Sequence, residues 1–265
     1  MTRAHRTGPD PTGARESVAT TVSVVVPVRD DAVALDRLLA ILASQTVAPL
    51  EVVVVDNASS DDSAAVAHRW GAVVVHEPRV GIPAAAATGY DTAKGDVIGR
   101  LDADSRPDAR WVQTVVERMR DDPTLDAMTG TGRFHDLPVG VRTVASAVYL
   151  GAYYAFTHLA LGHTSLWGSC LAVRGSTWET VRERVVRDDA EVHDDLDLAF
   201  RLGPGRRIRL LPSWRVEVSA RSLRGRRQRR RRMDRAWRTL RLNWDESPPW
   251  ERWRDRWAPR PTAMR

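Results

Sequence analysis

Asp102 and Asp104 form an Asp-x-Asp pair that directly follows a short apolar segment of this 265-residue chain. If residues 96–101 form a buried strand, both carboxylates point from its end toward one place. Hard divalent cations such as Mg²⁺ and Mn²⁺ bind carboxylate oxygens together with phosphate oxygens. Alone the pair is a weak signal, because two aspartates also occur in turns and helix caps. A divalent-metal site for a phosphorylated ligand is therefore a hypothesis that the rest of the chain must support.

A second polar cluster follows the apolar segment of residues 51–56, which ends in Asp56. The next residues include Asn57, Ser59, Ser60 and Asp61. Their carboxylate, amide and hydroxyl groups suit hydrogen bonds to a nucleobase and a ribose. Ser60 or Asp61 can also cap the following helix, and the two roles are compatible. This cluster adds a nucleotide to the hypothesis.

A third cluster is the acidic segment HDDLDL of residues 193–198. Closely spaced carboxylates raise one another's pKa, which suits a general base. A helix start with acidic residues, favoured by the helix dipole, explains the same pattern. Upstream, Trp167 can stack on a sugar or pack in the core. His163 and His193 are candidates for a further metal ligand, although a lone histidine is more often structural.

These clusters belong to a chain that alternates β-branched apolar segments with amphipathic ones. Strands are predicted at residues 21–28, 51–56, 72–76 and 96–101, and helices at 31–44, 61–70, 83–94 and 110–121. Such alternation is typical of a parallel sheet, whose ligands bind outside the carboxyl ends of the strands. Asp30 after the first strand, Asp56 to Asp62 after the second and Asp102 to Asp104 after the fourth should therefore meet at one edge. Farther along, strands are predicted at 129–135, 166–174, 206–211 and 214–218, and helices at 179–186 and 193–202.

Three motifs together resemble family-two glycosyltransferases, and their order and spacing agree over residues 22–108. The motifs are VSVVVPVRDD, VVVVDNASSDDS and GIPAAAATGYDTAKGDVIGRLDADSRP. The resemblance implies an α/β fold of the GT-A (Rossmann-like) kind, with a mixed, mainly parallel sheet flanked by helices. It also implies inverting transfer of a sugar from a UDP- or GDP-linked donor to an acceptor hydroxyl, assisted by Mg²⁺ or Mn²⁺.

The resemblance also assigns roles to residues of this chain. It implies nucleotide-sugar contacts by Pro27, Val28, Arg29, Asp30, Asp56, Ser59, Arg79, Ala85, Gly89, Asp102, Ala103 and Asp104. Asp102 and Asp104 would hold the metal, Asp195 would be the general base beside Asp194, and Trp167 and Gly168 would lie near the acceptor. Two departures stand out: Asp194 replaces a more usual Glu, and many members carry Asn or Arg where this chain has Ala84–Ala87.

Composition divides the chain into three parts. Residues 1–20 are a predicted disordered leader without the apolar stretch of a signal peptide, and 21–220 form the predicted glycosyltransferase domain, with a nucleotide half (21–108) and an acceptor half (109–220). The basic tail of residues 221–265 holds sixteen arginines against five acidic residues. This excess favours an anionic membrane surface or a lipid-linked or phosphorylated acceptor as partner, with a solvated helix as the plainer alternative. Nucleic acid is disfavoured, because no RNA-reading motif accompanies the arginines.

The single cysteine, Cys170, and the lack of a signal peptide favour a reducing, cytoplasmic location, peripheral at the inner face of the plasma membrane. The apolar segment 143–162 has the length of a membrane span, but its position inside the domain favours a buried or interfacial helix. A non-catalytic scaffold that binds membrane or nucleic acid through the tail is the main alternative function. The first strand is followed neither by a Gly-rich triphosphate loop nor by G-x-G-x-x-G, which disfavours a nucleotidyltransferase and an oxidoreductase.

Overall fold

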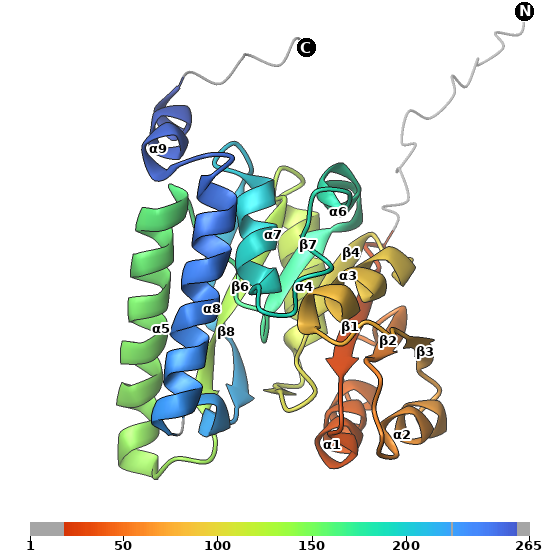
Figure 1. Cartoon of the computed structure of the whole chain (residues 1–265). Coiled ribbons are helices and arrows are strands. Elements are labelled where there is room, and N and C mark those ends of the chain that lie inside the picture. The colour runs from red at the N-terminus through yellow and green to blue at the C-terminus, as the bar shows by residue number, and fades with distance from the viewer. Residues whose placement is uncertain (1–18, 224, 259–265) are drawn as a thin grey trace, which may run out of the picture.

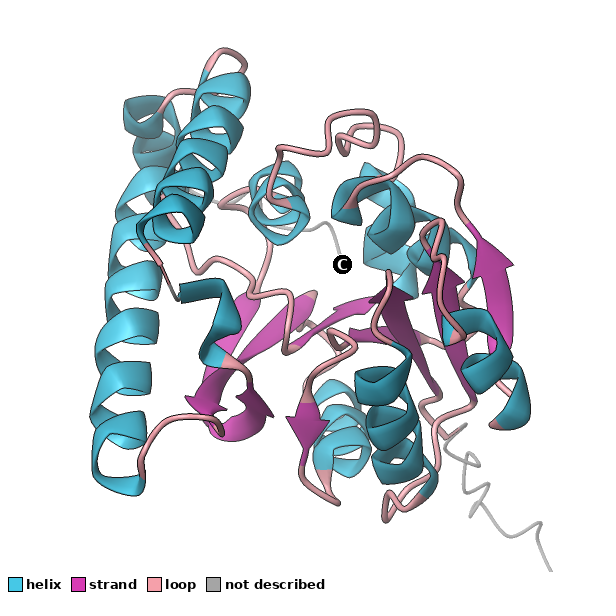
Figure 2. Cartoon of the chain, turned by 60° about the horizontal axis from the view of Figure 1, so that its bottom comes forward, coloured by secondary structure: helices cyan, strands magenta, loops and turns pink. Residues whose placement is uncertain are grey.

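The computed structural model describes residues 19–223 and 225–258. Most of the predicted leader, together with Arg224 and residues 259–265 of the tail, lies outside the described residues. One eight-stranded sheet, in the order β3-β2-β1-β4-β7-β6-β8-β5, runs through the molecule (Figure 1). Helices cover both of its faces, as Figure 2 shows. The predicted α/β GT-A-like architecture is confirmed.

The first half of the chain forms the parallel part of the sheet. It consists of β1 (Val22–Val28), α1 (Ala32–Ala43), β2 (Glu51–Asp56), α2 (Ser63–Arg69), β3 (Val73–His76), α3 (Ile82–Thr92) and β4 (Val97–Arg100). β1 pairs with β2 and β4 in parallel, and β2 pairs with β3 in parallel. Each of these elements was predicted within two residues of its observed bounds, because uninterrupted valine runs fit a strand that is buried on both sides.

The second half adds strands of mixed direction. It contains β5 (Arg106–Pro107), α4 (Trp111–Asp121), β6 (Ala127–Phe134), α5 (Val139–Leu161), β7 (Leu171–Arg174), α6 (Gly175–Val181), α7 (Asp194–Leu202) and β8 (Ile208–Val218). β7 is antiparallel to β4 and β6, whereas β8 is parallel to β6. The prediction of a mainly parallel sheet with mixed additions is therefore correct.

Three predictions in this half were wrong in their bounds. The strand predicted at 166–174 begins only at Leu171, because residues 166–170 form a loop and turn at the site edge. The helix predicted at 179–186 lies earlier, as α6 (Gly175–Val181). The two strands predicted at 206–211 and 214–218 are one strand, β8. Its pairing shifts at a bulge beside Pro212, which has no backbone N–H to donate to a regular ladder.

Alternate residues of the buried strands supply two cores. Val24 and Val26 pack on the side of α1, α2 and α4, while Val25 packs on the side of α3, α6 and α7. On the first side, Trp111 stacks on Trp214 with ring centroids 5.0 Å apart. This two-sided burial fixes the register of β1, so that its carboxyl end opens at one defined place on the sheet edge.

The basic tail packs on the domain as η1 (Ala220–Leu223), α8 (Arg226–Trp244) and α9 (Pro249–Trp257). In α8, Asn243 donates to the buried Asp197 of α7 at 3.0 Å, and the hydroxyl of Thr239 accepts from the backbone N–H of His193 at 2.8 Å. Arg252 of α9 is buried and donates to the carbonyl oxygens of Leu161 and Phe200. The fold thus includes the predicted basic helical tail, and α8 lies against α7 (Figure 1).

α5 is a long helix at the margin of the molecule (Figure 1). Within residues 19–223 and 225–258, it alone is long and apolar enough to cross a membrane by length and composition. Only five of its residues are buried, namely Ser146, Leu150, Thr157, Ala160 and Leu161. The alternative of a buried helix is therefore wrong. Its exposed large apolar side chains are Val139, Val141, Val144, Val148, Phe156 and Leu159.

Candidate active site

A cavity of about 390 Å³ opens at the carboxyl ends of β1 and β4. It is bounded by the β1–α1 loop, the start of α3, the segment after β4, the loop before β7, the start of α7 and the arginines of η1 and α8. The predicted site residues that line it are Pro27, Val28, Arg29, Ala85, Asp102, Ala103, Asp104, Trp167, Gly168, Asp194 and Asp195. The sheet thus brings together the Asp-x-Asp pair and the acidic motif, which lie far apart in the sequence.

Five predicted residues do not line this cavity: Asp30, Asp56, Ser59, Arg79 and Gly89. Asp30 and Ser59 fasten the β1–α1 loop to the β2–α2 loop, and Asp56 holds the β2–α2 loop itself. The Asp30 carboxylate accepts from the N–H of Ser60 at 2.7 Å, the Ser59 hydroxyl accepts from the N–H of Asp30 at 3.2 Å, and Asp56 accepts from the N–H of Ser59 at 3.0 Å. Asp30 has a φ of 52°, in the left-handed region that Asp tolerates better than most residues. This strained turn directs the next residue, Asp31, into the cavity.

Arg79 and Gly89 also have partners inside the protein. Arg79 forms ion pairs with Glu77 at 2.9 Å and with Asp188 at 3.0 Å. Gly89 faces the sheet, where a Cβ atom would come within 2.3 Å of Val25. Their contact with a nucleotide, like that of Asp30, Asp56 and Ser59, stays a prediction.

Asn57 lines the cavity and fixes the loop that precedes α3. Its amide donates to the carbonyl oxygens of Glu77 and Arg79 at 3.0 and 2.7 Å, and its carbonyl accepts from the N–H of Gly81 at 2.8 Å. The second polar cluster therefore reaches the cavity through Asn57, with Asp56 behind it. Asn57 belongs to the polar cluster predicted from the sequence, whereas Asp31, which follows the predicted Asp30, was not singled out; both line the cavity.

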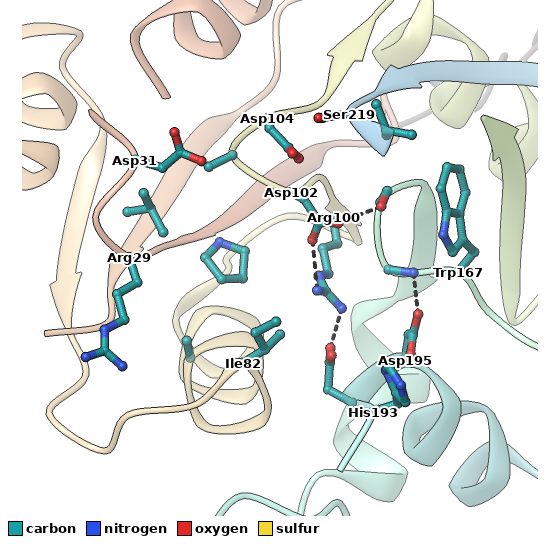
Figure 3. A pocket seen from close by; sticks show the side chains of 18 of the residues that line it. Arg29, Asp31, Ile82, Arg100, Asp102, Asp104, Trp167, His193, Asp195 and Ser219 are labelled. Carbon is teal, nitrogen blue, oxygen red and sulfur yellow. Dashed lines mark hydrogen bonds and ion pairs between the residues drawn. The ribbon is translucent and has the colours of Figure 1, made fainter. Parts of the chain in front are cut away.

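The two carboxylates of the Asp-x-Asp pair have different partners, and Figure 3 draws those of Asp102. Asp102 accepts from Arg100 at 3.0 Å and from the Ser169 hydroxyl at 2.5 Å, so both of its oxygens are engaged. Asp104 lies 3.2 Å from the guanidinium of Arg221. Burial and the neighbouring charge of Asp102 raise the pKa of Asp104 to about 6, and the charge of Arg221 opposes that rise.

Arg100, which was not predicted from the sequence, connects the Asp-x-Asp pair with the acidic motif (Figure 3). Its side chain is only 3% exposed, and it pairs with Asp102 and Asp194. Removing one partner of such a buried pair typically costs about 3–5 kcal/mol. A charged residue at the end of the apolar segment VIGR was the available signal. The Arg100 guanidinium fits here because residue 168 is a glycine; a Cβ atom at Gly168 would lie 2.6 Å from it.

Asp194 and Asp195 begin α7. Asp195 accepts from the backbone N–H of Gly168 at 2.7 Å, which fixes one of its oxygens (Figure 3). Burial raises the pKa of Asp194, the charge of Arg100 opposes this shift, and the charge of Asp195 adds to it. Asp194 thus pairs with Arg100, and both Asp194 and Asp195 line the cavity.

The other predicted residues of this region have mixed environments. Trp167 lines the cavity but is 5% exposed, and Gly132 admits its ring, since a Cβ there would come within 2.2 Å. His193 lines the cavity, whereas His163 contacts Thr164 and Arg252 and lies outside the cavity lining. Burial lowers the pKa of both histidines, to about 4 in His163. Core packing is thus part of the role of Trp167, and His163 is no ligand at this site.

The donor set fits a hard divalent cation held jointly with a phosphorylated ligand. No group of three or more His, Cys, Asp or Glu side chains suited to a metal occurs among residues 19–223 and 225–258. Mg²⁺ in nucleotide sites typically needs only one or two carboxylates, with phosphate and water oxygens completing its shell. Asp102, Asp104 and Asp31 supply carboxylate oxygens only, and a cation already lies beside Asp104 in the form of Arg221.

Comparison with known proteins places the chain in a family. The sequence pattern of the family described as "Glycosyl transferase family 2" matches residues 23–156, which is half of the chain. The chain belongs to this glycosyltransferase family. An uncharacterized glycosyltransferase of Mycobacterium tuberculosis is 37% identical over 112 residues, which cover 42% of this chain and 49% of that protein. Glycosyltransferase AglE of Haloferax volcanii is 30% identical over 100 residues, covering 35% of this chain and 33% of AglE.

The matched part of each of these curated relatives is thus half of its length or less. Among solved structures, a mannosyltransferase of Pyrobaculum calidifontis in complex with GDP-Man and Mn²⁺ is similar, with a TM-score of 0.65 and 23% identity over 92% of this chain and 67% of that one. Glucosyl-3-phosphoglycerate synthase of Mycobacterium tuberculosis, in complex with Mn²⁺, UDP and glucosyl-3-phosphoglycerate, has a TM-score of 0.58 and 18% identity over 83% of this chain and 80% of that one. At these identities the likeness establishes the fold.

Proposed function

We propose that the protein transfers a sugar from a nucleotide-diphosphate sugar to an acceptor hydroxyl, with inversion and with the help of Mg²⁺ or Mn²⁺. The observation that carries the proposal is the shared cavity, in which Asp102 and Asp104 lie on one side and Asp195 on another. The similar structures that contain GDP-Man or UDP with Mn²⁺ support a GDP- or UDP-linked donor.

The donor would bind between β1 and β4. Arg29, Asn57 and Ala85 line the part of the cavity next to the nucleotide loops, where hydrogen-bonding groups and a small side chain leave room for base and ribose. Asp104 and Asp102 would hold the divalent cation, which when bound offsets the negative charge that builds on the departing diphosphate. Ser169 and Arg100 keep the Asp102 carboxylate oriented, so that little rearrangement is needed.

The acceptor would bind on the side of Asp195. As the hydroxyl oxygen attacks the anomeric carbon, the bond to the diphosphate breaks on the opposite face and the proton passes to the Asp195 carboxylate. One displacement of this kind inverts the anomeric configuration. The N–H groups of Gly168 and Leu196 each donate to one carboxylate oxygen of Asp195, at 2.7 and 2.8 Å. Each oxygen has a second lone pair with which it can accept the proton. Asp194, by pairing with Arg100, connects the position of this base to that of the metal pair.

A lipid-linked or phosphorylated acceptor and a cytoplasmic location at the inner face of the plasma membrane belong to the same proposal. Arg232 and Arg235 of α8 reach the cavity lining, where they would favour an anionic acceptor. Beside them, α5 exposes an apolar face at helical spacing, formed by Val141, Val144, Val148, Ala152, Ala155 and Leu159. Arginines on an adjacent helix and an apolar face suit the interface of an anionic bilayer.

Tryptophans extend the α5 face toward the C-terminus. Trp244 donates to the carbonyl of Ala160 at 3.2 Å and packs against Trp237 at 5.8 Å, and Trp253 donates to the carbonyl of Leu159 at 2.9 Å. Trp237 and Trp257 are more than half exposed. Indole rings prefer the boundary between headgroups and acyl chains, so this arrangement supports a helix that lies on the membrane.

Calorimetric titration with UDP and with GDP, each with and without Mn²⁺, tests the donor site. We expect Mn²⁺-dependent binding of one of the two, and its loss in Asp104→Asn. Asp121→Asn, at an exposed carboxylate at the end of α4, is a control that should bind like the wild type. If the folded wild type binds neither nucleotide, the enzyme proposal fails and a non-catalytic scaffold takes its place.

A further inference from the structure

A guanidinium lies between two carboxylates of the donor side of the cavity. Arg221 is 2.5 Å from Asp31 and 3.2 Å from Asp104. Asp31 follows β1, Asp104 follows β4, and Arg221 comes from η1, the short helix after β8. The C-terminal segment, outside the residues matched by the family pattern, therefore contributes a positive charge to the proposed metal site.

The backbone that carries Arg221 is anchored. The Ser219 hydroxyl and the N–H of Ala220 both donate to Asp136 at 2.8 Å, and the N–H of Arg221 donates to the Ser219 hydroxyl at 3.1 Å. The side chain itself is 59% exposed. A long side chain on a fixed base can move its guanidinium by several ångströms without unfolding the segment, which an internal buried arginine such as Arg100 cannot do.

The guanidinium of Arg221 is stable beside Asp104 only while no other cation binds that carboxylate. If Arg221 were absent, the carboxylates of Asp31, Asp102 and Asp104 would face one cavity. No positive charge would then lie between Asp31 and Asp104. A divalent cation bound to Asp104 would repel a guanidinium 3.2 Å from the same carboxylate. The diphosphate that arrives with the cation brings new negative charge to the same place. Arginine binds phosphate oxygens with two parallel hydrogen bonds, for which its planar fork is suited.

We propose that Arg221 is a diphosphate-binding residue that serves as the counter-ion of Asp31 and Asp104 while the site is empty. On binding of the cation with the nucleotide, the guanidinium leaves Asp104 and donates to the diphosphate. This proposal rests on the proposed glycosyl-transfer function for the identity of the ligand. Arg221 would thus compete with a cation that binds without a ligand, and it would assist a cation that binds together with a diphosphate.

The two effects have opposite signs, which makes Arg221→Gln an informative variant. Mn²⁺ alone, titrated by electron paramagnetic resonance, should bind about fivefold more tightly than to the wild type, because one competing charge is removed. UDP or GDP in saturating Mn²⁺ should bind about 10- to 100-fold more weakly, because charge-assisted hydrogen bonds are lost. UMP or GMP, which lacks the second phosphate, should lose less affinity. Arg221→Lys should restore the weak Mn²⁺ binding and only part of the diphosphate affinity.

Arg215→Gln is the matched control. Arg215 is an exposed arginine of β8 outside the cavity lining, and its substitution should change neither titration. Thermal unfolding of each variant establishes that it is folded. Equal losses for UDP and UMP, or unchanged Mn²⁺ affinity in Arg221→Gln, would overturn the proposal even if the enzyme is active. If the wild type binds no nucleotide, the proposed function and the diphosphate role fail together, and the Mn²⁺ titration still decides the counter-ion role.

Discussion

At the scale of single residues, the site depends on how each carboxylate is paired. Asp102 is held by Arg100 and Ser169, Asp194 by Arg100, and Asp195 by the backbone N–H groups of Gly168 and Leu196. Asp195 is thus the acid of this group whose hydrogen-bond donors are all neutral. That difference separates a carboxylate that can accept a proton from those that hold the structure together.

Asp195→Asn should lower turnover by about 10²- to 10⁴-fold, the usual contribution of a general base. Nucleotide affinity should stay within about twofold, since the substitution changes neither Asp104 nor Arg100. Turnover is measured by release of UDP or GDP once an acceptor is known, and donor hydrolysis serves until then. Near-normal turnover in a folded Asp195→Asn protein would remove Asp195 from the base role.

At the scale of elements, the contact of α3 with the sheet and the loop before α3 position one wall of the cavity. Gly89 lets α3 approach β1 and β2, because a Cβ would lie 2.3 Å from Val25 and 2.9 Å from Val55. Glu77 supports the loop before α3 through Arg79 and through the Thr88 hydroxyl, which donates to it at 2.6 Å. Gly89 and Glu77 thus both help to position α3, and Ala85 of this helix lines the cavity.

Gly89→Ala should destabilise the fold by about 1–3 kcal/mol, because the added methyl group overpacks the contact between α3 and the sheet. Denaturant unfolding measures the change. Gly151→Ala is the control, since a Cβ there meets nothing within 4 Å, and it should be neutral or slightly stabilising. A variant that is as stable as the wild type but binds UDP or GDP weakly would instead support the predicted nucleotide contact of Gly89.

Glu77→Gln should cost about 1–3 kcal/mol at pH 7. Hydrogen bonds from Arg79, opposed by burial, lower the pKa of Glu77 from 4.5 to about 2. A lowered pKa means that the carboxylate stabilises the fold above about pH 4.5 and that this contribution fades as the pH falls toward 2. The difference between variant and wild type, measured by urea unfolding, should therefore shrink below pH 4.5. The exposed Glu183→Gln is the control, and a penalty that does not change with pH would contradict this account.

At the scale of the whole molecule, the site and the α5 face are coupled by the C-terminal helices. α8 contacts α7 at Asp197 and contributes Arg232 and Arg235 to the cavity, while α9 packs against the end of α5. A protein that rests on a membrane through α5 would thereby hold its acceptor side close to the lipid surface. This arrangement connects the proposed location with the proposed acceptor.

The double variant Val144→Asp/Val148→Asp should lose at least about tenfold in affinity for vesicles containing phosphatidylglycerol, because both side chains are about two-thirds exposed and would carry charge into the interface. Vesicle flotation measures the change, and nucleotide binding should be unaffected. Val33→Asp, at an equally exposed valine of α1, is the control. Unchanged flotation would contradict the membrane role, and a monomer replacing a wild-type dimer in light scattering would reassign the face to self-association.

The sequence by itself determined the parallel half of the sheet and the edge at which the polar clusters meet. Valine runs that are buried on both sides and helices with apolar stripes are local patterns, and the carboxyl ends of parallel strands share one edge by construction. The meeting of Asp102, Asp104 and Asp195 in one cavity was expected from the order of the motifs and from the family resemblance. The bounds of β7, β8 and α6 did not follow, because a bulge at Pro212 and a loop at residues 166–170 depend on the neighbouring strands.

Only the tertiary structure decided which side chains meet. Arg100 is one charged residue in an apolar strand until Asp102, Asp194 and the space left by Gly168 surround it. Arg221 belongs to a basic tail by composition, yet its guanidinium reaches Asp31 and Asp104. Ion pairs of this kind depend on distances between residues that are remote in sequence, and no local pattern encodes such distances. The physical reason is that strand periodicity is fixed by neighbours along the chain, whereas charge pairing is fixed by neighbours in space.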